Sequence, residues 1–167
     1  EISSRINAIL KIITQEMLFQ EVIVFTSDKD KRLTCRFANN ESMIFKILNQ
    51  YRCHIGEGII GSVAQKRTPQ FFTNKDISPR FGCLFYPELD DYIHKYRTFS
   101  FLPLADDSYL YGVLVLCSSA KDSIRDTEKI LLSMLSRELG GVLRTNDLIF
   151  SSKKRISELA TLSELGK

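Results

Sequence analysis

The sequence predicts an α+β fold in which short strands lie between two helical ends. Near the start, apolar residues recur every three or four positions over residues 2–17, which is typical of an amphipathic helix with one buried face. Residues 22–25 and 33–38 have the composition of strands and flank a polar turn at residues 27–30, which predicts a β-hairpin. A second helical pattern begins near residue 124 and continues to the end of the chain.

The segments between the hairpin and the last helix are short. Their expected elements, in chain order, are a helix over residues 42–48, a strand before residue 56, a helix over residues 62–67, and strands over residues 70–72, 97–104 and 112–116. Residues 76–96 contain Pro79, Gly82 and Pro87 among many aromatic residues, so this segment is expected to form a loop with short helical turns.

A glycine-rich turn, formed by Gly56, Gly58 and Gly61, is the most informative motif. Its G-x-G-x-x-G spacing is that of a dinucleotide-binding loop, and Asp76 lies where such proteins place a ribose-binding acid. The following helical run stops at Thr68 after about two turns, whereas a βαβ crossover needs a longer helix. We therefore interpret the glycines as structural, because they allow positive φ and close packing of the helix against the strand.

The order of the motifs resembles that of the GAF domain, a ligand-binding and dimerising module of signalling proteins, over about residues 3–145. The motifs are G-x-G-I-I-G-S-V-A at residues 56–64, the strand end Pro103-Leu104, and G-V-L-V-L at residues 112–116. The resemblance implies a central antiparallel sheet of about five or six strands, as in GAF and PAS domains. N- and C-terminal helices would pack on one face of the sheet, and a cover of loop and short helices on the other.

The resemblance also implies a division of the chain. Residues 1–145 would form the GAF domain, and residues 146–167 a connector helix that leads to a further module. We accordingly expect a piece of a longer protein, whose output domain is absent from this chain and which takes part in two-component or cyclic-nucleotide signalling.

The irregular segment is the expected ligand site. A segment of about twenty residues without regular structure in a compact domain is often a binding loop. Aromatic side chains can form the walls of an apolar pocket, and the resemblance places the ligand cover here. The candidate ligand-binding residues are Phe72, Asn74, Phe81, Phe85, Tyr92, Tyr96 and Phe99. A nearly equal alternative is that these aromatic side chains only seal the sheet.

A cyclic-nucleotide ligand is one possibility for this site. The cyclic-nucleotide-binding branch of the family carries an N-K…F-x-x-x-D-E signature, and this chain has Asn74-Lys75, Phe85 and Asp90-Asp91. The spacing is one residue too long and the final acid is aspartate. The identity of the ligand stays open, and Arg80 or Arg97 is the cation that would meet a phosphate.

The four cysteines suggest neither a zinc site nor a disulfide framework, because Cys35, Cys53, Cys83 and Cys117 lie far apart. Cys53 and His54 are adjacent in an expected strand, where neighbouring side chains point to opposite faces and cannot act together. Some free-standing GAF proteins reduce methionine sulfoxide with a cysteine in the glycine turn, where this chain has Ile60. We therefore expect no enzymatic activity, no catalytic residue, no metal and no cofactor.

Composition narrows the possible partners. The net charge is only +3, and the lysines and arginines are scattered among acidic residues. This distribution gives no basic stripe that would bind nucleic acid or anionic lipid. Apolar runs are far shorter than the roughly 18 residues that span a bilayer. We expect a cytoplasmic location, and neither nucleic-acid nor membrane partners for this segment.

The last helix carries an apolar pattern with four-three spacing, which is typical of a coiled coil. Its members are Leu135, Leu139, Val142, Asn146, Ile149, Lys153, Ile156 and Ala160. Residues up to about Leu143 are expected to pack on their own domain. Beyond that point we expect a parallel homodimer, with the seam Val142, Asn146, Ile149 and Ile156. Ligand sensing and a ligand-free dimerisation scaffold are therefore the two functions left open.

Overall fold

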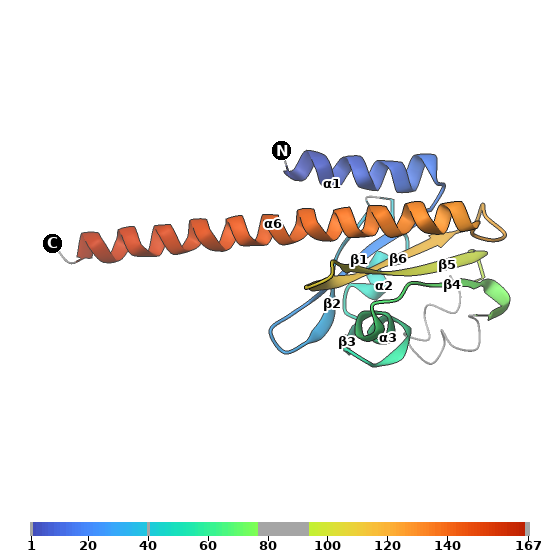
Figure 1. Cartoon of the computed structure of the whole chain (residues 1–167), viewed down its shortest axis with the longest axis horizontal. Helices are drawn as coiled ribbons and strands as arrows, with labels where there is room; N and C mark the ends of the chain where they lie inside the picture. Colours follow the sequence, from blue (N-terminus) through green and yellow to red (C-terminus); the bar gives the residue numbers. More distant parts are fainter. Residues whose placement is uncertain (1, 40, 77–93, 166–167) are drawn as a thin grey trace.

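A six-stranded antiparallel sheet forms the centre of the computed structural model, which describes residues 2–39, 41–76 and 94–165 (Figure 1). The strand order is β3-β2-β1-β6-β5-β4, and every neighbouring pair is antiparallel. The strands are β1 (Glu21–Ser27), β2 (Arg32–Ala38), β3 (Arg52–His54), β4 (Gln70–Thr73), β5 (Thr98–Ala105) and β6 (Leu110–Ser118). The predicted fold class and the predicted hairpin, β1–β2, are confirmed.

The helices of the described residues differ widely in length. They are α1 (Ile2–Lys11), continued by a π-helical turn η1 (Ile12–Glu16), α2 (Phe45–Leu48), α3 (Gly58–Lys66) and α6 (Asp126–Leu165). Figure 1 shows α1 and α6 on one side of the sheet and α3 on the other. We call the first side the helix face and the second, which also carries α2, the covered face.

Alternation along the central strands supplies a separate core to each face. Val22 and Val24 of β1 pack in the cluster with α1 and α6. Ile23 and Phe25 pack in the cluster with α2 and α3. All four side chains are fully buried, so β1 is apolar on both faces, which is the pattern of a strand in the middle of a covered sheet.

The glycine turn combines positive φ with a close backbone approach. Gly56 and Gly58 adopt φ of +100° and +65°. A Cβ on Gly61 would lie 2.5 Å from the carbonyl oxygen of His54. The amides of Gly56 and Gly61 donate to backbone carbonyls within the turn, at 2.8 and 2.9 Å.

The arrangement of the strands is incompatible with a dinucleotide-binding βαβ unit. The strands before and after α3, β3 and β4, lie at opposite edges of the sheet. A βαβ crossover instead joins parallel strands of one sheet. The shortness of the helix, from which we argued against nucleotide binding, reflects this antiparallel topology.

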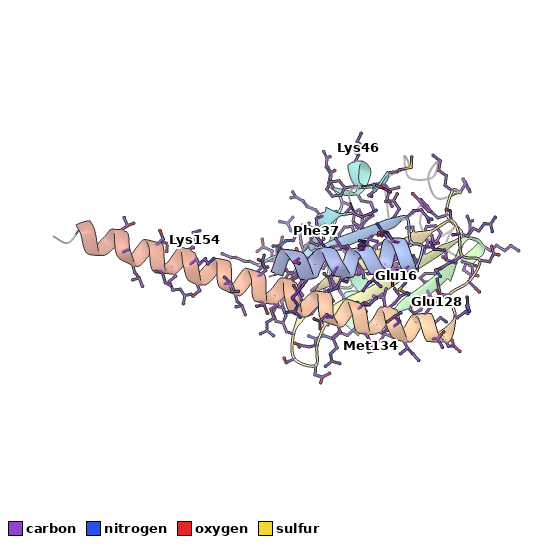
Figure 2. The ribbon with its side chains drawn as sticks, turned by 90° about the horizontal axis from the view of Figure 1, so that it is seen from above. Glu16, Phe37, Lys46, Glu128, Met134 and Lys154 are labelled. Carbon is purple, nitrogen blue, oxygen red and sulfur yellow. The ribbon has the colours of Figure 1, made fainter. Side chains whose placement is uncertain are left out.

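The last helix is a single element of 40 residues. Its first half packs on β5 and α1, and Gly140 allows a close approach because a Cβ there would lie 3.1 Å from the backbone of Leu104. Its second half extends beyond the sheet, where Lys154 is labelled in Figure 2. Among the described helices, α6 included, none combines the length and apolarity that crossing a bilayer requires.

Alanine substitutions in the turn test its structural role. Gly58→Ala should lower the free energy of unfolding by about 1 kcal/mol, because alanine is strained at positive φ. Gly61→Ala should cost about 1–3 kcal/mol, because its Cβ meets backbone that cannot move aside. Gly141→Ala is the matched control: no atom lies within 4 Å of its added Cβ, so in the exposed helix it should be neutral or stabilising. Urea unfolding measures all three, and equal stabilities of the two turn variants and wild type would show the turn to be ordinary.

Candidate functional site

The floor of the covered face is built from alternate residues of the central strands. Phe99 and Phe101 of β5 are buried beside Val113, Val115 and Cys117 of β6. Edge-on ring contacts extend this floor to both sides. Tyr96 meets Phe99 with centroids 6.2 Å apart, and Phe72 meets Phe101 at 6.0 Å.

Four of the seven candidate ligand residues come together here. Phe72, Tyr96 and Phe99 belong to this aromatic floor, and Asn74 lies beside them at the end of β4. The backbone amide of Asn74 donates to the carbonyl of Arg97 at 2.9 Å, and its side-chain amide donates to the carbonyl of Tyr96 at 2.7 Å. Asn74 thus joins the chain before residue 77 to the chain after residue 93.

The other predicted residues of this segment cannot be placed. Phe81, Phe85 and Tyr92 lie outside the described residues, as do Arg80 and the acidic pair at 90–91. Arg97 is described and faces solvent, where it pairs with Asp122 at 2.7 Å. Its guanidinium is therefore on the surface rather than on the covered face.

Glu21 is a buried acid that the sequence reasoning missed. Only 1% of its surface is exposed, and it opposes Cys117 across β1 and β6. One carboxylate oxygen accepts from the Tyr96 hydroxyl at 2.6 Å and from the backbone amide of Met43 at 2.8 Å. The other accepts from the Ser42 hydroxyl. Glu21 therefore fastens both the segment before α2 and the segment before β5 to the sheet.

The surroundings of Glu21 define what it can recognise. A carboxylate offers about four acceptor positions, and donors from the described residues occupy three of those of Glu21. Within the described part of the chain, no lysine or arginine forms an ion pair with it. A buried acid without a cationic partner favours groups that donate hydrogen bonds or carry positive charge. The signal in the sequence was an acid immediately before an apolar run, in phase with Ile23 and Phe25.

The described cysteines are poor nucleophiles. Burial raises the pKa of the Cys35 thiol to about 12, and it raises the pKa of Cys53 as well. Burial also raises the pKa of Cys117, and the negative charge of Glu21 adds to this effect. Cys53 is buried while His54 is exposed, as expected for neighbours in a strand. Cys83 lies outside the described residues.

Titratable residues do not gather into a metal site in the described part of the chain, where no group of three or more histidine, cysteine, aspartate or glutamate side chains could hold an ion. The covered face therefore offers, in its described part, an aromatic floor and one buried acid. Stacking and hydrogen bonding are the interactions that these side chains offer. Among the described side chains of this face there is no activated nucleophile beside a base.

The raised pKa values predict slow thiol chemistry. In a Cys83→Ser variant at pH 8, the three remaining thiols should react with DTNB far more slowly in the native state than in urea, because thiolate is the reactive form. Each folded thiol keeps its proton above the ordinary pKa of about 9. The unfolded chain releases protons there, so stability should fall as the pH rises past 9. One thiol that reacts at the unfolded rate in the native protein would contradict this prediction.

Comparison with known structures shows the same fold in proteins described as GAF domains. A GAF domain/HD domain protein from Geobacter sulfurreducens is 12% identical, with a TM-score of 0.69 over 89% of this chain and 95% of that one. The GAF domain of a two-component sensor histidine kinase from Bacillus halodurans is 13% identical, with a TM-score of 0.66 over 89% and 97%.

An enzyme also shares this fold. The type II free methionine-R-sulfoxide reductase from Thermoplasma acidophilum is 12% identical, with a TM-score of 0.63 over 86% of this chain and 93% of that one. Among curated proteins, the sequence has no match. The GAF domain family model matches residues 1–143, and the chain therefore belongs to the GAF domain family.

Proposed function

We propose that this chain is a sensory and regulatory module that acts on an attached output domain through α6, with two copies joined in parallel along that helix. The observation that carries the proposal is an apolar surface on α6 that the domain does not cover. The similar GAF domain of a sensor histidine kinase supports a regulatory role. The function rests on this surface and on the covered face together.

The exposed apolar residues of α6 lie along one side of the helix. Among its described side chains, seven large apolar ones are between 40% and 64% exposed: Ile130, Leu131, Met134, Leu148, Ile149, Ile156 and Leu159. At 3.6 residues per turn these positions fall within about 100° of the helix circumference. We call these seven residues the α6 stripe. It runs from the part of α6 above the sheet into the part beyond it.

The α6 stripe changes the set of residues that we propose for the dimer seam. Val142 is buried within its own chain, with 4% of its surface exposed, and Asn146 is half-buried on the same side of the helix. The sequence pattern merged two faces, because the residues that pack on the domain and those that lie free beyond it share similar spacing. The proposed seam therefore keeps Ile149 and Ile156 and adds Leu148 and Leu159.

A second copy is the partner that fits this surface. All described side chains from residue 152 to residue 161 are exposed, so this part of α6 has no support from its own domain. A single unsupported helix of this length is only marginally stable in water. Parallel pairing of two chains buries both stripes and brings both C-terminal ends together. An interface of about 1,000 Å² is needed for stable association, which requires most of the stripe.

Small-molecule sensing belongs to the covered face in this proposal. The buried acid Glu21 favours a ligand that donates hydrogen bonds or carries positive charge over an anionic cyclic nucleotide, because two negative groups repel in a site with little water. The alternative is a scaffold in which Phe25, Phe99 and Phe101, all fully buried, fill the face themselves.

We also propose that the domain has no turnover of its own. The described thiols are protonated, and those of Cys53 and Cys117 are buried. The position of the catalytic turn cysteine is taken by Ile60, itself buried. Similarity to the reductase, at 12% identity, concerns the fold alone.

The dimer proposal is tested by charge on the stripe. The double variant Ile156→Asp, Leu159→Asp should be a folded monomer, while wild type at high micromolar concentration should have twice the chain mass of 19.2 kDa by light scattering. Both side chains are exposed, so the double variant should still unfold in one cooperative transition. The matched control is Ser157→Asp, Thr161→Asp, which adds the same charge on the opposite side of the helix and should remain dimeric. A monomeric wild type, or equal masses for both double variants, would refute the seam.

The ligand proposal is tested by thermal shift. The domain is heated with cyclic AMP, cyclic GMP and a panel of amino acids and amines, because a ligand that binds only the native state raises the melting temperature. We expect a rise with an amine or amino acid that is lost in Glu21→Gln and kept in the control Glu138→Gln, whose acid lies on the surface of α6. A rise with cyclic nucleotides alone would contradict the role of Glu21. No rise with any compound favours the scaffold.

A further inference from the structure

Three side chains meet where α6 leaves the sheet. Asp147 of α6 accepts two hydrogen bonds from the Arg36 guanidinium, at 2.8 and 3.0 Å. It accepts a third from the Tyr111 hydroxyl at 2.7 Å, and Arg36 also donates to that hydroxyl. The bonds from Arg36 lower the pKa of Asp147, which keeps the carboxylate charged at neutral pH. We call Arg36, Tyr111 and Asp147 the exit junction.

Both sheet residues of the exit junction lie at β-bulges. In the β1–β2 ladder, Val24 pairs with Phe37 and Phe25 pairs with Cys35, so Arg36 is an extra residue without a partner on β1. In the β5–β6 ladder, Leu104 pairs with Gly112 and Ala105 pairs with Leu110. Tyr111 is the extra residue there. Bulges of this kind change the direction of a side chain and interrupt the regular ladder.

The bulge in β6 decides which face Tyr111 occupies. Val113, Val115 and Cys117 point to the covered face, so strict alternation would place Tyr111 with them. Tyr111 instead packs in the cluster of the helix face, where it is 5% exposed. The irregularity of the strand is thus what brings the tyrosine hydroxyl to α6.

The exit junction lies at the boundary between the supported and unsupported parts of α6. Before it, Arg144 stacks on the Tyr109 ring and pairs with Asp106 at 3.6 Å, which ties the helix to the β5–β6 turn. After it, no described side chain of α6 hydrogen-bonds to the sheet. Asp147 is therefore the final attachment seen in the described part of the helix.

We propose that the exit junction fixes the direction in which α6 leaves the domain and couples the β1–β2 hairpin to the output end of the helix. The effect of the exit junction on an output domain rests on the regulatory function proposed above, whereas its control of the direction of α6 does not. The two bulges lie in β2 and β6, which also supply buried residues to the covered face, among them Leu33 and Val115. A shift of β2 or β6 therefore reaches α6 through Arg36 or Tyr111.

We expect the exit junction to set the direction of α6 more than to stabilise the fold. Arg36 and Asp147 side chains are 36% and 43% exposed, and ion pairs in that range add little to stability unless the geometry is bidentate or networked. Here it is both. The junction variants should therefore keep a cooperative unfolding transition while the outer part of α6 loses its fixed direction.

Distances between spin labels test this role. Nitroxides are attached at Lys29→Cys in the hairpin turn and Lys154→Cys beyond the sheet, in a Cys83→Ser background. The labelled chain is diluted with unlabelled chain so that only distances within one chain are measured. We expect a narrow distance distribution in the parent, and at least a doubling of its width in Asp147→Asn and in Tyr111→Phe. Amide exchange at residues 144–150 should rise about fivefold, with little change at residues 130–140.

The matched control is Glu138→Gln. Glu138 is also an α6 carboxylate paired with an arginine, Arg5 of α1, but it lies over the sheet and contacts no bulge. Its label distances should equal those of the parent. Equal distributions in the parent and in both junction variants would overturn the proposal.

The outcome is independent of dimerisation. Light scattering of the same samples gives the oligomeric state. If the protein is a monomer and the distance distribution broadens in Asp147→Asn, the exit-junction proposal is supported and the dimer proposal is refuted. If the protein is a dimer and the distances do not change, the dimer proposal is supported and the exit-junction proposal is refuted.

Discussion

Burial of both faces of one sheet is the constraint on which the rest of this structure depends. The side chains of Val22, Ile23, Val24 and Phe25 are all fully buried, so the central strand β1 needs an apolar layer on each side. On the helix face that layer comes from α1 and α6, and on the covered face from α2, α3 and the segments around them. The two layers differ in what they contain. The covered face holds the candidate site, and the helix face includes α6, which continues beyond the sheet.

A sheet that separates two layers must also connect them if it is to transmit a signal. In a regular strand, alternate side chains point to the two faces, and each side chain contacts only the layer on its own face. Bulges break this alternation. At Arg36 and Tyr111 the break occurs in the two strands that flank β1, and both side chains reach the same carboxylate of α6. Irregular pairing therefore accounts for the contact between the sheet and Asp147 of α6.

The sequence was sufficient for features set by local pattern and insufficient for those set by pairing. Residues 22–25, the hairpin, the glycine turn and the long last helix follow from periodicity and turn chemistry, and the structure has them all. Glu21 escaped notice because one acid beside an apolar run gives no periodic signal, and its partners Ser42 and Tyr96 come from distant segments. The bulges depend on the register between strands, which the sequence does not display. Val142 is buried against the domain, because the packed face of α6 and its exposed stripe have similar spacing and lie on adjacent sides of the same helix.

Because α6 is long, a small change of its direction at the exit junction displaces its far end by a much larger amount. Beyond Asp147 the helix continues for about 18 residues, or about 27 Å at 1.5 Å per residue. A tilt of about 10° at the base of such a helix moves its far end by about 5 Å, roughly the pitch of one helical turn. In the proposed dimer, a pair of helices joined along the α6 stripe resists independent tilting, so a change at one base must either shift both helices together or rotate one against the other. In that proposal the exit junction sets the starting direction of each helix, the stripe sets how the two helices pair, and a small change on the sheet reaches an attached domain without unfolding of the module.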